Sequence, residues 1–135
     1  MRHSITLAKK ILLVDDEPDI TFTIKDILED NGFQVESFND PISALNYYKV
    51  SFYDLVILDI KMPKMDGFEL YTKIREKDPK VKICFFTATA MFTEEIKKAL
   101  LALGKTINED YFIQKPVRIE VLIKKITLIM NKNKE

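Results

Sequence analysis

Short apolar runs alternate five times with segments of helical periodicity, and this alternation restricts the possible folds more than any other feature of the chain. The runs that predict strands lie at residues 11–14, 33–38, 55–58, 81–86 and 111–113. Helices are predicted from Pro18 to Asn31-Gly32, from Pro41, from Gly67, from Thr93 and from Val117. Strand–helix alternation builds βαβ units with right-handed crossovers. The sequence therefore predicts a doubly wound α/β fold, a three-layer sandwich of one five-stranded parallel sheet and five helices.

The helical segments carry apolar stripes that we expect to face the sheet. In the second and fifth helices these stripes are Ile42, Leu45 and Tyr48, and Val121, Leu122, Ile126, Ile129 and Met130. In the fourth helix, Thr93 is the expected N-cap and the stripe is Ile96, Ala99, Leu100 and Leu103. The inner strand runs are continuously apolar, as strands covered on both faces are expected to be.

The length of 135 residues is that of one domain, and we predict a folded unit at 10–130 with an N-terminal extension at 1–9 and a C-terminal tail at 131–135. Lys+Arg and Asp+Glu both number 21, so the zero net charge gives no reason to expect nucleic-acid binding. No apolar run approaches the length of a membrane span or of a signal-peptide core. The lone Cys84 cannot form an intrachain disulfide and is predicted to lie in the core. A cytoplasmic location without membrane association is the resulting expectation.

Asp59 is the residue that points most directly to chemistry. It follows the apolar run Leu55–Leu58 and precedes a turn marked by Pro63 and Gly67, so we expect it at the carboxyl end of a buried strand. In open α/β sheets, ligands bind at that edge. The same edge is expected to receive Asp15 and Asp16 from the first strand, Thr87 from the fourth and Lys115 from the fifth.

Together these side chains would form a site suited to phosphoryl transfer. Three neighbouring carboxylates repel one another unless a cation lies among them, and Mg²⁺ is commonly bound by one or two carboxylates together with water and phosphate oxygens. Lys115 adds a positive charge, and the Thr87 hydroxyl can donate to an anionic oxygen. A carboxylate nucleophile beside a metal and a cation can transfer phosphoryl groups by positioning and charge neutralisation.

Taken singly, most of these residues have plainer explanations. Asp15-Asp16 can simply begin a helix, because acids there complement the helix dipole. Thr87 can be an ordinary strand end, and Lys115 can be a solvated surface lysine. Asp59 is harder to explain, because an acid at the mouth of an apolar strand needs a partner. The functional interpretation rests on all of them meeting at one edge of the sheet.

Four motifs in this order resemble the receiver domain of two-component response regulators. They are Asp15-Asp16, Asp59 with Met62-Pro63 and Met65-Asp66-Gly67, Thr87-Ala88, and Lys115-Pro116. The resemblance covers residues 10–130 and implies a flavodoxin-like sheet with strand order 2-1-3-4-5. It also implies that Asp59 accepts a phosphoryl group from a sensor histidine kinase or a phosphotransfer protein, becoming a 4-aspartylphosphate in a Mg²⁺-dependent reaction.

The same resemblance assigns the metal ligands. Asp16 corresponds to the direct Mg²⁺ ligand beside Asp59, and Asp15 to a residue that assists through water. The third protein ligand corresponds to the backbone carbonyl of Lys61, so the side chain of that residue is not implicated. Catalysis of this kind is limited to self-phosphorylation and self-dephosphorylation, and no enzymatic turnover of a separate substrate is implied.

The resemblance also implies a switch and a partner surface. Thr87 corresponds to the switch hydroxyl, Lys115 to the ammonium that pairs with the phosphorylated aspartate, and Phe112 to an aromatic that turns inward. Phe112 lacks the hydroxyl that would mark its inward or outward state. Thr87 and Lys115 are 28 positions apart, several more than in the family, and the excess falls at 104–110. This loop borders the surface of the fourth helix, fifth strand and fifth helix, through which receivers bind effectors or form homodimers, so an unusual partner surface is expected.

Three alternatives come from other classes of protein. A haloacid-dehalogenase-type phosphatase also uses a strand-end aspartate with Mg²⁺, but it needs a second aspartate where this chain has Lys61. A flavodoxin-like redox module would carry a Ser/Thr/Gly-rich phosphate loop after the first strand, where this chain has Asp15-Asp16-Glu17-Pro18. A pseudo-receiver would act as an interaction module without phosphorylation. It would keep the fold and lose site residues, none of which is lost here.

Overall fold

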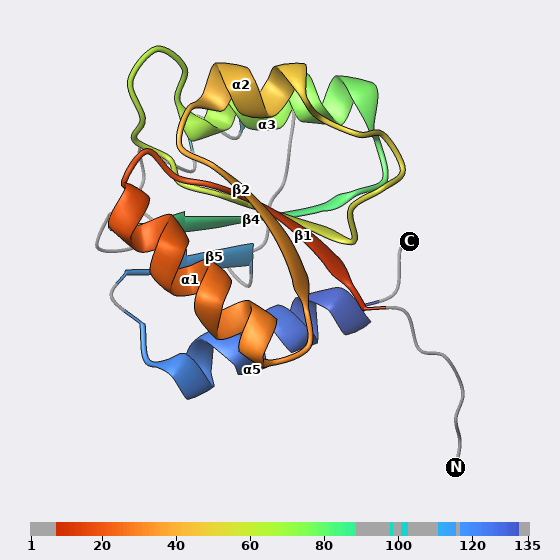
Figure 1. The fold of residues 1–135 in the computed structure, drawn as a ribbon. Coiled ribbons are helices and arrows are strands. Elements are labelled where there is room, and N and C mark those ends of the chain that lie inside the picture. Colours follow the sequence, from red (N-terminus) through yellow and green to blue (C-terminus); the bar gives the residue numbers. More distant parts are fainter. Residues whose placement is uncertain (1–7, 89–97, 99–100, 103–110, 116, 133–135) are drawn as a thin grey trace.

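The computed structural model describes residues 8–88, 98, 101–102, 111–115 and 117–132, which contain one five-stranded sheet with helices on both faces (Figure 1). The strands are β1 (Lys10–Val14), β2 (Gln34–Phe38), β3 (Leu55–Leu58), β4 (Lys82–Thr87) and β5 (Phe112–Gln114). They lie in the order β2-β1-β3-β4-β5, and every neighbouring pair is parallel. The predicted fold class and strand order are therefore confirmed.

Four complete helices lie within the described residues: α1 (Pro18–Asp30), α2 (Pro41–Asn46), α3 (Gly67–Lys77) and α5 (Ile119–Asn131). Pro18 and Pro41 begin α1 and α2, where a missing N–H costs no helical hydrogen bond. Asp40 and Asp66 cap α2 and α3, because each carboxylate accepts a hydrogen bond from the backbone N–H three residues later. Nearly all of the helix predicted from Thr93 lies outside the described residues.

Among the helices that the structure describes in full, α2 and α3 cover one face of the sheet and α1 and α5 the other (Figure 1). Alternate residues of β1 supply the two cores. Leu12 and Val14 pack with residues of α2 and α3, whereas Ile11 and Leu13 pack with residues of α1 and α5. All four side chains are 0% exposed, so β1 is buried on both faces, as its continuous apolar run predicts.

Two residues of the predicted apolar stripes lie at the surface instead. Ile42 is 40% exposed, because the short helix α2 turns Pro41 and Ala44 toward the core. Val121 is 38% exposed, because the buried stripe of α5 begins at the next residue, Leu122. Neighbouring residues on a helix point in directions about 100° apart, so both errors are shifts of one or two positions around the helix. The other stripe residues within these two helices are buried or packed against the cores as predicted: Leu45, Leu122, Ile126, Ile129 and Met130. Tyr48 also packs against a core, but it lies beyond the end of α2 at Asn46, so the predicted helix is shorter than expected.

The prediction for Cys84 is confirmed, because its side chain is fully buried in β4 and burial raises the pKa of the thiol to about 12. Within the described ranges, no helix has both the length and the apolar character to cross a bilayer. The predicted extension at 1–9, the loop at 104–110 and the tail at 131–135 lie wholly or largely outside the residues that the structure describes.

Candidate functional site

Backbone hydrogen bonds continue the sheet by one residue past its strand ends and fix three of the predicted site residues. The N–H of Asp15 donates to the carbonyl of the last residue of β2 at 3.1 Å. The N–H of Asp59 donates to the last carbonyl of β1 at 2.9 Å, and that of Lys115 to the last carbonyl of β4 at 2.7 Å. The three side chains therefore leave the same edge of the sheet from backbone positions that neighbouring strands hold in place.

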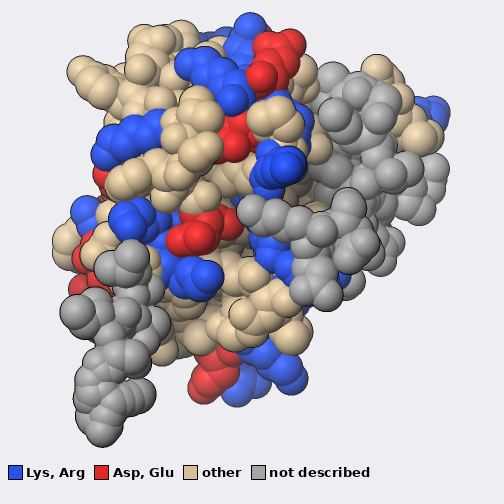
Figure 2. All heavy atoms as spheres, turned by 90° about the vertical axis from the view of Figure 1, so that its right-hand side faces the viewer, with Lys and Arg blue, Asp and Glu red and all other residues tan. Residues whose placement is uncertain are grey.

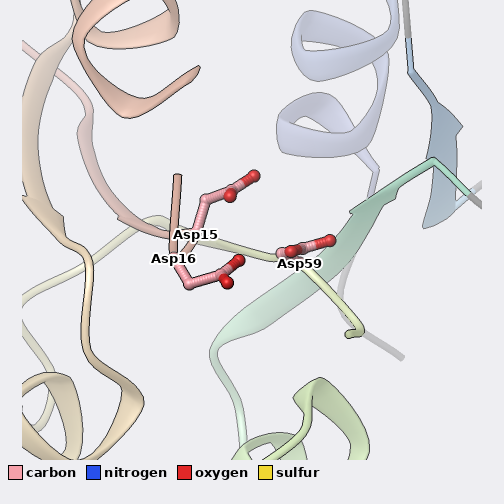
Figure 3. Close-up of side chains that lie close together, drawn as sticks. All are labelled: Asp15, Asp16 and Asp59. Atoms are coloured by element: carbon pink, nitrogen blue, oxygen red, sulfur yellow. The ribbon is translucent and has the colours of Figure 1, made fainter. Parts of the chain in front are cut away.

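Asp15, Asp16 and Asp59 bring their carboxylates together at this edge (Figure 3). One oxygen of each group lies within 4.8 Å of the corresponding oxygens of the other two. Asp15 is 0% exposed and Asp59 is 6% exposed, whereas Asp16 is partly exposed. Asp15 Oδ1 accepts a hydrogen bond from the Glu17 N–H at 3.0 Å, and Asp59 Oδ1 accepts one from the Ile60 N–H at 2.9 Å. These bonds orient the two buried groups but leave three like charges close together.

Lys115 places a cation beside this cluster. Its Nζ lies 2.6 Å from Asp15 Oδ2, 3.5 Å from Asp59 Oδ1 and 3.8 Å from Glu17 Oε1. Burial by itself would lower the pKa of Lys115, but the pairing with Asp15 and the nearby carboxylates outweigh it and hold that pKa above its usual value. The ammonium is therefore charged at neutral pH. Its nearest partner is Asp15 and not Asp59.

The Asp59 carboxyl has the pKa most visibly changed by this crowding. Burial raises the pKa, and the neighbouring Asp15 charge raises it further, while Lys115 and the Ile60 N–H oppose the change. The result is a pKa of about 6. At neutral pH the group is therefore mostly a carboxylate, but one that gains more than an ordinary aspartate does from binding a proton or a cation.

A pocket of about 370 Å³ opens at the cluster, and it is lined by Asp16, Glu17, Asp59, Lys61, Thr87, Ala88 and Lys115. The structure thus gathers the predicted side chains of the first, third, fourth and fifth strand ends around one space. Asp15 is fully buried and contacts this group through Lys115.

Glu17 was not among the predicted site residues. The signal that could have found it is its place directly after Asp16, in the same strand-end turn.

The two residues predicted to form the switch lie on neighbouring strands. Thr87 is 4% exposed and lines the pocket. Phe112 does not line it: its ring stacks on Phe85 with centroids 5.1 Å apart, on the face covered by α2 and α3. The structure therefore places Thr87 at the site and Phe112 in the adjoining core, and their coupled movement stays a prediction.

Gly67 shapes the turn that follows Asp59. A Cβ at this position would lie 2.2 Å from the Asp59 carbonyl oxygen and 2.8 Å from Ile60 Cα. The Gly67 N–H also donates to the Ile60 carbonyl at 2.7 Å. The start of α3 can therefore approach the backbone of Asp59 only because residue 67 has no side chain.

The oxygen donors of this edge fit a hard divalent cation such as Mg²⁺. Asp16 has no hydrogen bond or ion pair to any other described residue, so its carboxylate is available as a ligand. Asp59 lies beside it, and Lys61, whose backbone carbonyl was predicted as a third ligand, lines the same pocket. Asp15 is already paired with Lys115 at 2.6 Å. This pairing fits the predicted role of Asp15, which assists metal binding through water, better than direct coordination of the metal.

Comparisons with known proteins agree on one family. The family model described as the response regulator receiver domain matches residues 11–127. The sensor protein EvgS of Escherichia coli K12 is 36% identical over 120 residues, which are 87% of this chain and 10% of EvgS. The transcriptional regulatory protein CpxR homolog of Haemophilus influenzae is 36% identical over 124 residues, which are 92% of this chain and 51% of that protein. The chain thus spans between a tenth and about half of the length of these relatives.

A solved structure supports the same grouping. The response regulator TrrA of Thermotoga maritima, in complex with Mg²⁺ and BeF, superimposes with a TM-score of 0.71 at 30% sequence identity. The alignment covers 90% of this chain and 98% of TrrA. The sequence matches cover 87% and 92% of this chain and the structural match 90%.

Proposed function

The chain belongs to the response regulator receiver domains of two-component systems, and we propose that it accepts a phosphoryl group on Asp59 in a Mg²⁺-dependent reaction. The proposed donor is a sensor histidine kinase or a phosphotransfer protein. Phosphorylation would then alter a protein-interaction surface that includes β5 and α5. The proposed chemistry is limited to self-catalysed phosphorylation and dephosphorylation of the chain, without turnover of a separate substrate.

One observation carries the proposal: three carboxylates and one ammonium meet at the carboxyl edge of the sheet around a pocket. Asp59 is the member of this group that combines burial, a pKa near 6 and a place on the pocket wall. Structural acids rarely gather in this way, because each would be better stabilised by a partner of its own. Perturbed groups that share one pocket are typical of functional sites.

In the proposed reaction, an Asp59 carboxylate oxygen attacks the phosphorus atom of the donor. A bond forms between that oxygen and phosphorus, and the bond between phosphorus and the donor breaks, with the electron pair leaving on the donor atom. Mg²⁺ would be held by Asp16, Asp59 and the Lys61 carbonyl, and when bound it would supply positive charge that offsets the charge of the transferred group. The Asp59 pKa of about 6 keeps the nucleophile mostly deprotonated at neutral pH.

The remaining pocket residues would bind the product. Lys115, whose Nζ lies 3.5 Å from Asp59 Oδ1, would pair with the new phosphoryl oxygens. The Thr87 hydroxyl lines the same pocket and would donate to one of them. Because Thr87 and Phe112 belong to adjacent paired strands, a movement of the first can reach the second through the β4–β5 ladder. The structurally similar response regulator TrrA was solved in complex with Mg²⁺ and BeF, and this supports Mg²⁺ as the proposed metal.

Incubation with acetyl phosphate and Mg²⁺, followed by intact-mass measurement, tests the proposal. The wild-type chain is expected to gain one phosphoryl group, and the Asp59→Asn variant none. Asp54→Asn is the matched control, because Asp54 directly precedes β3 whereas Asp59 directly follows it, and this variant is expected to be labelled like the wild type. Equal labelling of Asp59→Asn would contradict the assignment. An unlabelled wild-type chain would favour the pseudo-receiver alternative.

A further inference from the structure

Asn39 lies outside every motif of the site, yet it contacts the backbone that carries the acidic pair. Its Nδ2 donates to the Asp15 carbonyl oxygen at 2.9 Å and to Thr21 Oγ1 at 2.9 Å. The Thr21 hydroxyl in turn donates to the Pro18 carbonyl at 3.0 Å. The Asn39 side chain therefore joins the end of β2, the end of β1 and the first turn of α1.

The contact bears directly on Asp16. The Asp15 carbonyl and the Asp16 N–H belong to one planar peptide unit, so a hydrogen bond that holds the carbonyl also sets the orientation of the next residue. A carbonyl oxygen can only accept, which requires the amide NH₂ of Asn39 to face it. The Asp15 N–H is bonded to the neighbouring carbonyl of Phe38, so the peptide units on both sides of Asp15 are held.

Asp16 depends on this arrangement more than its neighbours do. The side chains of Asp15 and Asp59 are oriented by the N–H groups of Glu17 and Ile60 and by Lys115. The Asp16 carboxylate has no hydrogen bond or ion pair with another described residue. Its direction is therefore determined by the backbone from which it extends.

We infer that Asn39 is a positioning residue that orients Asp16 for divalent-cation binding by fixing the Asp15–Asp16 peptide. The inference rests on the proposed function, because it assumes that Asp16 binds a cation. Residues that orient metal ligands commonly change metal affinity by about 10- to 100-fold when they are removed. Asn39 holds one backbone carbonyl and not the ligand itself, so we expect the lower end of that range.

Titration of the ¹⁵N-labelled chain with MgCl₂, followed by the amide shifts of Asp16 and Asp59, tests the inference. Asn39→Ala is expected to weaken Mg²⁺ binding about tenfold. Its Asp16 amide signal is also expected to shift before any metal is added, because the hydrogen bond to that peptide is lost. Asn39 is exposed, so the alanine variant leaves no cavity in the core.

Two further variants separate positioning from general stability. Asn31→Ala is the matched control, since Asn31 Nδ2 also donates to a backbone carbonyl, that of Ile27 at 2.8 Å, but at the far end of α1. It is expected to leave Mg²⁺ affinity unchanged. Thr21→Val removes only one of the two acceptors of Asn39 and is expected to weaken binding less than Asn39→Ala does.

The outcomes distinguish this inference from the proposed function. If the wild-type chain binds Mg²⁺ and Asn39→Ala binds it within about twofold of the wild type, the positioning role is wrong and the proposed function stands. Equal weakening by Asn31→Ala would also overturn the positioning role. If the wild-type chain shows no saturable Mg²⁺ binding, the metal-dependent function itself fails and the inference fails with it.

Discussion

The two edges of the sheet treat their acidic side chains in opposite ways. At the amino edge, Asp54 accepts a hydrogen bond from the Lys10 N–H at 2.8 Å, and Asp78 accepts from the Tyr48 hydroxyl at 2.9 Å and the Ser51 N–H at 3.2 Å. Each of these acids has donors of its own. Figure 2 shows the molecule from the side on which β1 begins, where acidic and basic side chains lie next to one another.

At the carboxyl edge, Asp15 and Asp59 both lie close to Lys115, and Asp16 has no ion pair with a described residue. The difference is one of charge and not of missing hydrogen bonds, because no buried side-chain nitrogen or oxygen in the described part of the chain lacks a partner. The fold thus stabilises its acids individually at one edge and tolerates their repulsion at the other. A cation bound among these acids would relieve this repulsion, and the proposed function assigns that part to Mg²⁺.

The largest expected effect comes from disturbing the backbone under the crowded edge. Gly67→Ala would place a Cβ 2.2 Å from the Asp59 carbonyl oxygen. We expect it to lower the free energy of unfolding by about 3 kcal/mol, because backbone must move to admit the methyl group. Chemical denaturation measures this loss.

Gly32→Ala is the matched control at the end of α1, far from the site. Gly32 has a φ of +93° and no atom within 4 Å of an added Cβ, so only the left-handed conformation opposes the change. We expect a loss of about 1 kcal/mol. Equal losses at the two glycines would show that the close approach to Asp59 is not what requires Gly67.

Replacing aspartate by asparagine is expected to change the free energy of unfolding in opposite directions at the two edges. The pKa of Asp59 in the folded state is about 6, which lies above its ordinary value of 3.8. The contribution of this group to the free energy of unfolding is therefore fully present below pH 3.8, falls as the pH rises, and is lost once the pH has passed 6. Asp59→Asn is therefore expected to raise the free energy of unfolding by about 2–3 kcal/mol at pH 7.5, and by about half as much at pH 5.

Asp78→Asn at the amino edge keeps an acceptor oxygen but loses the charge that strengthens two hydrogen bonds. We expect it to lower the free energy of unfolding by about 1 kcal/mol. Denaturation of both variants at the two pH values measures the contrast. Destabilisation by Asp59→Asn at pH 7.5 would mean that the crowded edge is not electrostatically strained.

The smallest expected effect tests whether backbone strain also distinguishes the edges. Lys64 near the site and Ser51 near the opposite edge both have positive φ values, 72° and 61°. Replacing either by glycine relieves a left-handed conformation but makes the unfolded chain more flexible, so we expect changes of about 0.5 kcal/mol or less. Thermal unfolding of both variants checks this, and a gain of several kcal/mol at Lys64→Gly alone would place stored backbone strain at the site.

Much of the fold was predictable from the sequence, because the strand runs are short, apolar and ended by turn residues. The ends of these runs predicted which side chains share the carboxyl edge, since parallel strands end on the same side. The exposure of Ile42 and Val121 was not predictable from spacing alone. It depends on how far each helix rotates when it packs on the sheet, and that rotation is set by contacts distant in the sequence.

The finer features of the site depend on contacts that no local pattern encodes. Lys115 lies nearer to Asp15 than to Asp59, at 2.6 Å against 3.5 Å. These distances depend on how the carboxyl ends of β1, β3 and β5 are arranged at the edge of the sheet. Asn39 reaches the Asp15 carbonyl across 24 positions of sequence. The order of motifs identified which residues assemble, but the partners and distances among them came only from the three-dimensional arrangement.

Locating the phosphoryl group is the most direct test of the central claim. After incubation with acetyl phosphate and Mg²⁺, borohydride reduces an aspartyl phosphate to homoserine, and peptide mass spectrometry identifies the position. The account predicts homoserine at residue 59 and at neither residue 15 nor residue 16. Homoserine at Asp15 or Asp16, or a phosphoryl group retained on another side chain, would contradict it.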